Sequence, residues 1–240
     1  EDLTKAYSYF IQNTMFPIND SILSEVKYSP FAYDKHAKLF YTDDITSPSK
    51  DRGKFIDESI DLVKKILDIS QGKALILFTS KADMNAVYTR LKALNLNYTL
   101  IKQNEISSQQ QLIHKFKQDV NSVLLGTGVF WEGISIEGIA LSNLIIYKLP
   151  FPLPEPIINE KCKRSKNPLE EVLVPEMIIK LKQGVGRLIR NKTDKGIVSI
   201  IDSRLGDKSK ASYKEKVWQA LPIKQRTNSL KELQSFYDNL

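Results

Sequence analysis

The sequence predicts an α/β fold built on an open, mainly parallel sheet with helices on both faces. Short apolar segments such as 74–78 and 144–147 alternate with longer amphipathic segments, which is typical of strands that are covered by helices on both sides. At 240 residues, of which 42% are hydrophobic, the chain is long enough to bury a substantial core. The simplest organisation is one large domain, or one domain with a helical extension.

The first 28 residues are predicted to be a connecting segment from a preceding domain. Leu3 to Thr14 is expected to be a short helix, with a turn at 17–20 and an extended segment at 22–28. The chain starts at Glu1 with neither a methionine nor a signal-peptide pattern, which favours a piece of a longer protein.

Residues 29–205 are predicted to form the α/β domain. Apolar residues spaced as Ile56, Ile60 and Val63 mark its first amphipathic helix, which Gln71-Gly72 closes directly before the strand 74–78. The alternation continues with helices at 83–94 and 107–117 and with strands at 98–102, 122–125, 144–147 and 197–201.

Two polar regions complete the predicted organisation. An insertion is expected at about 151–170, from a proline-rich crossing at 150–156 and a polar, basic loop at 161–168. Residues 206–240 are expected to form a C-terminal helical extension. The extension contains a lysine-rich helix up to Trp218, a break at Leu221-Pro222 and a final helix from Ser229.

The composition limits the classes of function. A formal net charge of +7 and a pI near 9.2 favour a polyanionic partner such as nucleic acid, although lysines spread along the chain also serve solubility. A single cysteine, Cys162, argues against a disulfide framework and against a cysteine-ligated metal or iron–sulfur site in this chain. It also predicts a reducing, cytoplasmic setting. No apolar run approaches the length needed to cross a membrane.

The segment 183–190 carries the first signal for a functional site. On one continuous helix, Gln183, Arg187 and Arg190 would share a face at i, i+4 and i+7. A guanidinium group suits phosphate, and glycines at Gly184 and Gly186 would allow a ligand to approach closely. The segment therefore predicts a phosphate-facing surface. The alternative is a solvated helix face with a salt-bridging arginine.

A second signal lies in the segment 126–135, which contains three glycines. Backbone N–H groups of such a loop can hold an anion, and Thr127 adds a hydroxyl donor. The alternative is a tight turn in which the glycines provide positive φ angles. Phe130 is expected in the core, whereas Trp131 could either stack on bases or fill the core.

Other catalytic patterns are incomplete. Gly53-Lys54 and Gly72-Lys73 lack the rest of a phosphate-binding loop, and no acidic strand end suited to Mg²⁺ follows. His36 and His114 do not combine with acidic residues at ligand spacing, so no metal site is predicted. Asp43-Asp44 favours a solvated turn over a nuclease carboxylate pair. The chain can therefore contact a nucleotide from one side without providing a complete hydrolytic site.

At these residues the chain resembles superfamily 2 helicases. Phe78-Thr79-Ser80, 126–135 and 183–190 resemble motifs IV, V and VI of those proteins in order and spacing. The resemblance to DinG-type proteins, close relatives of XPD, covers roughly residues 25–222 and implies the second of two RecA-like motor domains. Its further residues are Ser29-Pro30-Phe31, Phe130-Trp131-Glu132-Gly133, Leu149-Pro150-Phe151-Pro152 and Asp202-Ser203-Arg204.

This resemblance implies roles for particular residues. Arg187 and Arg190 would be catalytic arginine fingers for ATP with Mg²⁺, which the first RecA-like domain, absent from this chain, would mainly bind. The isolated chain is therefore expected to be inactive. Residues implied in nucleotide binding are Gln183, Gly186, Glu132, Gly133 and Ser135. Residues implied in binding the backbone of single-stranded DNA are Thr79, Ser80, Thr127 and Gly128.

One residue departs from the family pattern. Motif V usually continues with an aspartate near the ribose, whereas this chain has Ser135, which loses the stronger charge-assisted bond. Some DinG-like proteins of low-GC Gram-positive bacteria carry an N-terminal 3′–5′ exonuclease domain. The alternative function is therefore a helicase-like domain that binds nucleotide and DNA to regulate such an exonuclease in the same polypeptide. A third alternative is an α/β scaffold with a basic surface.

Overall fold

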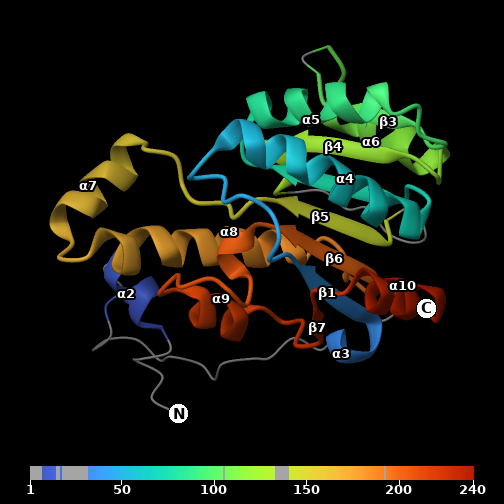
Figure 1. Ribbon diagram of the computed structural model, residues 1–240. Helices are drawn as coiled ribbons and strands as arrows, with labels where there is room; N and C mark the ends of the chain where they lie inside the picture. The colour runs from blue at the N-terminus through green and yellow to red at the C-terminus, as the bar shows by residue number, and fades with distance from the viewer. Residues whose placement is uncertain (1–6, 15–16, 18–31, 105, 133–140, 192) are drawn as a thin grey trace. The chain divides into compact units, whose positions relative to one another are not determined.

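The computed structural model describes residues 7–14, 17, 32–104, 106–132, 141–191 and 193–240 (Figure 1). The chain divides into two compact units, residues 1–30 and 31–240. In the first unit, helix α2 (Ser8–Thr14) falls within the helix predicted at 3–14. Apart from Pro17, the turn and extended segment expected at 17–28 lie outside the described residues.

A seven-stranded sheet forms the centre of the second unit (Figure 1). The strand order is β3-β4-β2-β5-β6-β1-β7, and every described pair is parallel, which confirms the predicted fold class. The strands are β1 (Ala37–Tyr41), β2 (Ala74–Phe78), β3 (Leu100–Lys102), β4 (Val123–Thr127), β5 (Asn143–Tyr147), β6 (Gly196–Ile201) and β7 (Arg226–Thr227).

Helices cover both faces of this sheet. Because both faces are covered, every residue of the central strands β2 and β5 is buried, with successive side chains on opposite sides. One face packs against α4 (Arg52–Ser70), α5 (Lys81–Ala93) and α10 (Leu230–Asp238). The other face packs against α6 (Gln109–Gln118), α8 (Val174–Val185) and α9 (Lys214–Ala220).

Local signals in the sequence explain where several helices begin and end. The side chain of Asp51 accepts a hydrogen bond from the backbone N–H of Lys54 and caps α4. The helix ends where Gln71 and Gly72 adopt left-handed φ angles of 51° and 81°. Ser108 forms a capping box at the start of α6. These boundaries agree with the predicted ones to within a few residues.

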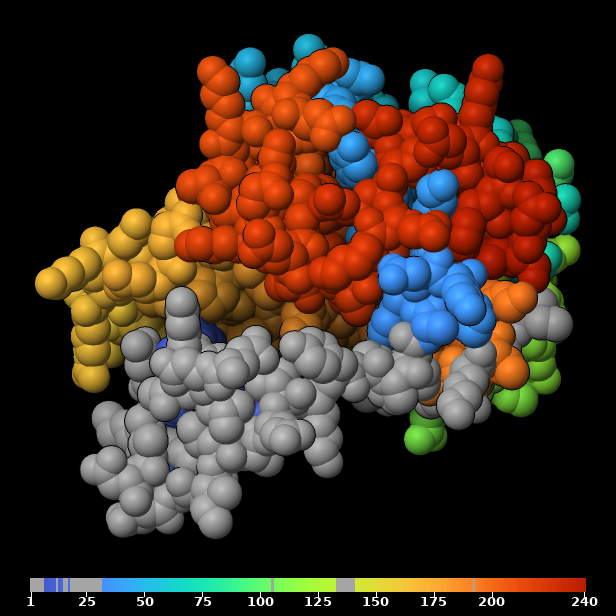
Figure 2. Space-filling view, turned by 90° about the horizontal axis from the view of Figure 1, so that it is seen from below, coloured from blue at the N-terminus to red at the C-terminus, as the bar shows by residue number. Residues whose placement is uncertain are grey.

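The sequence did not predict two strands at one end of the sheet. β1 pairs with β6, with Ala37 opposite Gly196, and also pairs with β7, with Leu39 opposite Arg226. Lys38 interrupts the apolar run of β1, and β7 has only two residues, so hydrophobic periodicity does not reveal either. Figure 2 shows the C-terminal residues (red) directly beside the blue residues that include α3 (Tyr33–His36).

The C-terminal region therefore contributes to the sheet as well as to the helical layers. Residues 206–240, which were expected to form a helical extension, contain the helices α9 and α10. They also supply β7, and Leu233 of α10 is buried in the same core as α4. Short 3₁₀ segments follow two strands, at Gly128–Phe130 (η2) and Ser203–Leu205 (η4).

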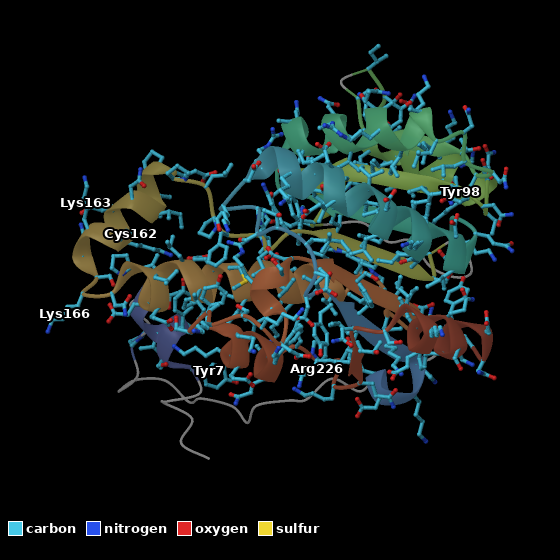
Figure 3. The ribbon with its side chains drawn as sticks, in the orientation of Figure 1. Tyr7, Tyr98, Cys162, Lys163, Lys166 and Arg226 are labelled. Atoms are coloured by element: carbon cyan, nitrogen blue, oxygen red, sulfur yellow. The ribbon has the colours of Figure 1, made fainter. Side chains whose placement is uncertain are left out.

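The prediction of a basic loop at 161–168 is wrong for the first half of this segment, which is helical. Helix α7 spans Pro156–Arg164 and is followed by a π-helical turn, η3 (Leu169–Leu173), which leads directly into α8. Pro156 fits the first helical turn, where a missing N–H costs nothing. The polar composition reflects a helix with no buried residue. In Figure 3, Lys163 lies on this helix and Lys166 on the turn that follows it.

A glycine in the sheet provides a test of this packing. A Cβ at Gly196 would lie 2.2 Å from the carbonyl oxygen of Ser142, a backbone atom that cannot move aside easily. We expect Gly196→Ala to lower the free energy of unfolding by roughly 1–3 kcal/mol, measured by urea denaturation. Gly53→Ala is the matched control, because the nearest atom to its Cβ is 3.5 Å away and α4 should gain about 0.5–1 kcal/mol. Equal midpoints for the two variants would contradict this account.

Candidate functional site

The carboxyl ends of the central strands form one aligned edge. Phe78 lies opposite both Thr127 and Tyr147, and Tyr147 lies opposite Ile201. The strands β3 and β4, which follow β2 in the sequence, lie on one side of β2, whereas β5 and β6 lie on its other side together with β1. The direction in which successive strands are added to the sheet therefore reverses at β2. Open parallel sheets bind ligands beyond the strand ends at such a point. The predicted segments that follow β2 and β4 therefore lie where a ligand is expected.

Trp131 joins three of the predicted motif segments. Its indole Nε1 donates to the carbonyl oxygen of Phe78 at 2.8 Å, and its own carbonyl oxygen accepts from Nε and Nη2 of Arg187 at 3.0 and 2.7 Å. A Cβ at Gly184 would lie 2.8 Å from the indole ring. The ring is completely buried. Trp131 therefore fills the core, as does Phe130, and connects the end of β2 to the end of α8.

The prediction that Gln183, Arg187 and Arg190 share one face of a continuous helix is wrong. α8 ends at Val185, Gly186 is its C-cap, and both Arg187 and Arg190 lie beyond the helix. The backbone N–H of Arg187 bonds to the carbonyl of Gly184, three residues back, so the last turn tightens and the helix stops. The missing side chain of Gly184 makes room for Trp131 rather than for a ligand. Gln183 remains on the helix and is exposed.

Arg187 and Arg190 are nevertheless close enough for their charges to interact. Burial lowers the pKa of Arg187, the positive charge of Arg190 lowers it further, and Glu132 opposes these effects. The backbone N–H groups of Arg190 and Asn191 donate to Asp194 Oδ2 at 2.9 and 3.0 Å, which fixes the turn. Because the two like charges repel each other, an anion beside them would be stabilised.

Two glutamines hold the segment that follows β4. The backbone N–H and Oγ1 of Thr127 donate to Gln103 Oε1 at 2.7 and 3.2 Å, and Gln109 Nε2 donates to the carbonyl of Val129 at 3.1 Å. Gly128 has a φ of 48°, and no atom lies within 4 Å of the position of its missing Cβ. Neither glutamine belongs to a motif that the sequence analysis identifies. The available signal for Gln103 was its position directly after the strand predicted at 98–102.

A buried carboxylate, Asp83, ties the end of β2 to the end of β5. Asp83 bonds to Arg52 Nε at 2.7 Å and to Lys148 Nζ at 2.5 Å, and Lys148 adopts a left-handed φ of 64°. Burial raises the pKa of Asp83, but the hydrogen bond and charge of Lys148, with the bonds of Ser80 and Arg52, lower the pKa overall. Ser80 Oγ accepts from the N–H of Asp83 and caps α5. The Ser-x-x-Asp spacing was a usable sequence signal for this arrangement.

A second buried carboxylate, Asp202, fixes the loop after β5. Its Oδ2 accepts from the N–H of Leu149 at 2.9 Å, and Arg204 Nη2 lies 2.6 Å from the same oxygen. Burial lowers the pKa of Arg204, but the hydrogen bond and charge of Asp202 raise it overall. The guanidinium of Arg204 lies 5.1 Å from the ring centroid of Phe151. Two motifs of the resemblance, 149–152 and 202–204, therefore form one packed unit.

A cleft of about 320 Å³ lies beside this unit. It brings together three of the predicted site residues, Thr79, Glu132 and Gln183. Thr127, Gly128, Arg187 and Arg190 do not line it, and Gly133 and Ser135 lie outside the described residues. The other lining residues are Pro150, Phe151, Pro152, Leu153, Glu155, Ile158, Glu176, Ile179 and Lys180.

No group of three or more histidine, cysteine, aspartate or glutamate side chains in the described part of the chain could hold a metal ion. No helix among the described residues is long and apolar enough to cross a membrane.

Known proteins match most of this chain. Residues 63–224 match the family described as Helicase C-terminal domain. The chain is 33% identical over 227 residues to the ATP-dependent DNA helicase YoaA of Haemophilus influenzae, covering 92% of this chain and 34% of that protein. It is 33% identical over 216 residues to the 3′-5′ exonuclease DinG of Bacillus subtilis, covering 85% of this chain and 22% of that protein.

The fold is also similar to solved structures. A structure named XPD_Helicase superimposes with a TM-score of 0.61 at 22% identity, covering 77% of this chain and 34% of that chain. This likeness confirms the expected RecA-like fold. The chain spans at most about a third of the length of the two curated relatives above.

The buried carboxylate at the end of β2 gives a prediction for stability. At pH 7, Asp83→Asn is expected to lower the free energy of unfolding by roughly 1.5–3 kcal/mol, because it removes the charge that two cations contact. The pKa of Asp83 is lowered in the folded state, so this stabilisation is present above the ordinary value of 3.8 and is lost as the pH falls through the folded pKa. Urea denaturation at several pH values measures the difference.

The matched control for this variant is Asp57→Asn, which removes the exposed Arg90–Asp57 pair at 2.8 Å. An exposed pair of this kind contributes about 0–1 kcal/mol. Equal losses for Asp83→Asn and Asp57→Asn would contradict the role of Asp83. A loss for Asp83→Asn that stays constant from pH 7 to strongly acidic pH would contradict it as well.

Proposed function

Because the chain belongs to the helicase C-terminal domain family and is of the DinG type, we propose that it is the second motor domain of an ATP-dependent DNA helicase. In this proposal Arg187 and Arg190 act as arginine fingers on ATP, which the first RecA-like domain binds with Mg²⁺. The chain also binds the backbone of single-stranded DNA. The observation that carries the proposal is the junction at Trp131, which connects the arginine-bearing turn to a predicted DNA-binding segment.

The nucleotide side of the proposal rests on the arginine pair. Arg187 and Arg190 are both half-buried residues whose like charges repel each other, and the triphosphate supplies the negative charge that stabilises two such cations together. An arginine that neutralises charge on the transferred phosphoryl group accelerates hydrolysis by about 10³ to 10⁵. Gln183, Gly186 and Glu132 are proposed to lie around the nucleotide. Gly133 and Ser135, which lie outside the described residues, are also proposed to take part in nucleotide binding.

The DNA side rests on the ends of β2 and β4. Thr79 and Ser80 follow β2, whereas Thr127 and Gly128 lie at the end of the neighbouring β4. Hydroxyl and backbone N–H groups are common donors to phosphate oxygens, and such contacts do not depend on base sequence. Ser80 Oγ accepts a bond at the start of α5 and its side chain also bonds to Asp83, so its O–H would exchange that acceptor for a phosphate.

A single carbonyl would couple these two sides. Arg187 directs two N–H groups at the carbonyl of Trp131. Any movement of Arg187 toward a phosphate would stretch these bonds and shift the segment that also holds Thr127 and Gly128. Nucleotide binding at one side would thus alter the hold on DNA at the other.

The second candidate function is regulation of a 3′–5′ exonuclease in the same polypeptide. The similarity to the 3′-5′ exonuclease DinG of Bacillus subtilis and Ser135 at the usual aspartate position favour it. The two functions differ in strand separation. A helicase separates a partial duplex when ATP is present, whereas a regulatory domain only changes the rate of nuclease digestion.

The arginine fingers can be tested in the full-length protein. Arg190→Ala is expected to lower DNA-stimulated ATP hydrolysis by about 10³-fold or more, because the charge next to the phosphoryl group is lost. The backbone bond from Arg190 to Asp194 is retained in this variant, so the turn should keep its conformation, and urea denaturation checks that the variant is folded. Arg90→Ala on α5 is the control and should leave ATP hydrolysis unchanged. Near-normal turnover by Arg190→Ala would exclude the proposed role.

DNA binding can be tested with the 240-residue chain alone. Its affinity for a fluorescein-labelled oligo(dT) is expected to fall with salt, with log K decreasing by about 0.7 per phosphate contact for each unit of log salt. Fluorescence anisotropy at several salt concentrations gives this slope. Absence of salt-dependent binding would favour an α/β scaffold whose basic surface has no role in DNA binding.

A further inference from the structure

Two donors of Thr127 converge on one oxygen atom. The backbone N–H and the hydroxyl of Thr127 both point at Gln103 Oε1, at 2.7 and 3.2 Å. An amide oxygen has two lone pairs and accepts two donors, as a phosphate oxygen does. The two groups that are proposed to bind a DNA phosphate therefore already have an acceptor, and that acceptor comes from the protein itself.

The surroundings of this contact allow an exchange of acceptors. Val129 is 53% exposed, and no atom lies within 4 Å of the missing Cβ of Gly128, so there is open space beside the two residues that follow Thr127, which is itself buried. The backbone N–H of Gln103 is anchored to the carbonyl of Leu125 at 2.9 Å. Only the side chain of Gln103 would have to rotate away for another oxygen to take its place.

From these contacts we infer that Gln103 is a positioning residue that holds the two donors of Thr127 ready and is displaced when a phosphate of single-stranded DNA binds. The inference rests on the proposed function and adds a protein group that competes with DNA. A phosphate oxygen is charged, and charge-assisted bonds are roughly twice as strong as neutral ones. The exchange therefore favours a phosphate over a neutral acceptor.

A neighbouring glutamine provides a matched control. Gln109 is the first residue of α6, close in sequence to Gln103, and it holds the same segment, but it donates to the carbonyl of Val129. A phosphate cannot accept from that carbonyl. Removal of the Gln109 side chain would loosen the segment without releasing the donors of Thr127.

The test measures the affinity of the 240-residue chain for labelled oligo(dT) by fluorescence anisotropy. Gln103→Ala is expected to bind about threefold to tenfold tighter, because it removes the competing acceptor. Gln103→Glu should bind more weakly than the unchanged chain, because it keeps the acceptor and adds a negative charge. Gln109→Ala should bind with unchanged or lower affinity. If Gln103→Ala does not fold, Gln103→Met keeps the length, lacks the acceptor and carries the same expectation.

A second measurement follows the amide proton of Thr127 by hydrogen exchange. In the chain without DNA, Gln103→Ala should accelerate this exchange, and oligo(dT) should restore protection in the same variant. A purely structural role for Gln103 would not give DNA-dependent recovery.

Different outcomes overturn different claims. Unchanged or weaker binding by Gln103→Ala, or equally tighter binding by Gln109→Ala, overturns the inference but not the proposed function. Absence of salt-dependent binding by the unchanged chain overturns both. Protection of the Thr127 amide that does not recover with bound DNA also overturns the inference.

Discussion

The functional edge of this domain depends on the burial of one indole ring. Trp131 leaves room for no side chain at position 184, bonds to the end of β2 and offers its carbonyl to Arg187. These three interactions join segments that are far apart in the sequence. Since the ring is fully enclosed, it cannot shift without moving its neighbours. The close packing makes the motif segments one mechanical unit rather than three independent loops.

Buried charges at the same edge serve a different purpose. Asp83 and Asp202 are almost fully buried. Asp83 is neutralised by Arg52 of α4 and by Lys148 after β5, and Asp202 by Arg204 of η4. Unpaired carboxylates beside a phosphate would repel it, whereas these paired ones fix the loops and leave the surface free for other groups. Lys148 adopts a left-handed backbone conformation in this arrangement. Its bond to Asp83 helps to offset the free-energy cost of that conformation.

Much of the fold was predictable because it is encoded locally. Apolar runs give the central strands β2 and β5, and capping residues such as Ser108 give helix starts. The end of α8 was not predictable from the sequence, because the helical spacing of apolar residues continues to Leu188. The packing of Trp131, which is distant in sequence, against Gly184 determines where the helix ends. For the same reason the partner of Thr127 was missed: Gln103 carries no motif of its own, and only the parallel register brings it to that position.

The position of β1 constrains how the domain can fold while it is being synthesised. β1 lies between β6 and β7, both of which are encoded more than half a chain later. Contacts of such high sequence separation form late and slow the folding of a domain. As the chain leaves the ribosome, β1 has no neighbour until nearly all of residues 31–227 have emerged. A nascent chain that stalls before β6 would therefore expose both edges of this strand to other polypeptides, and chaperones would have to protect it.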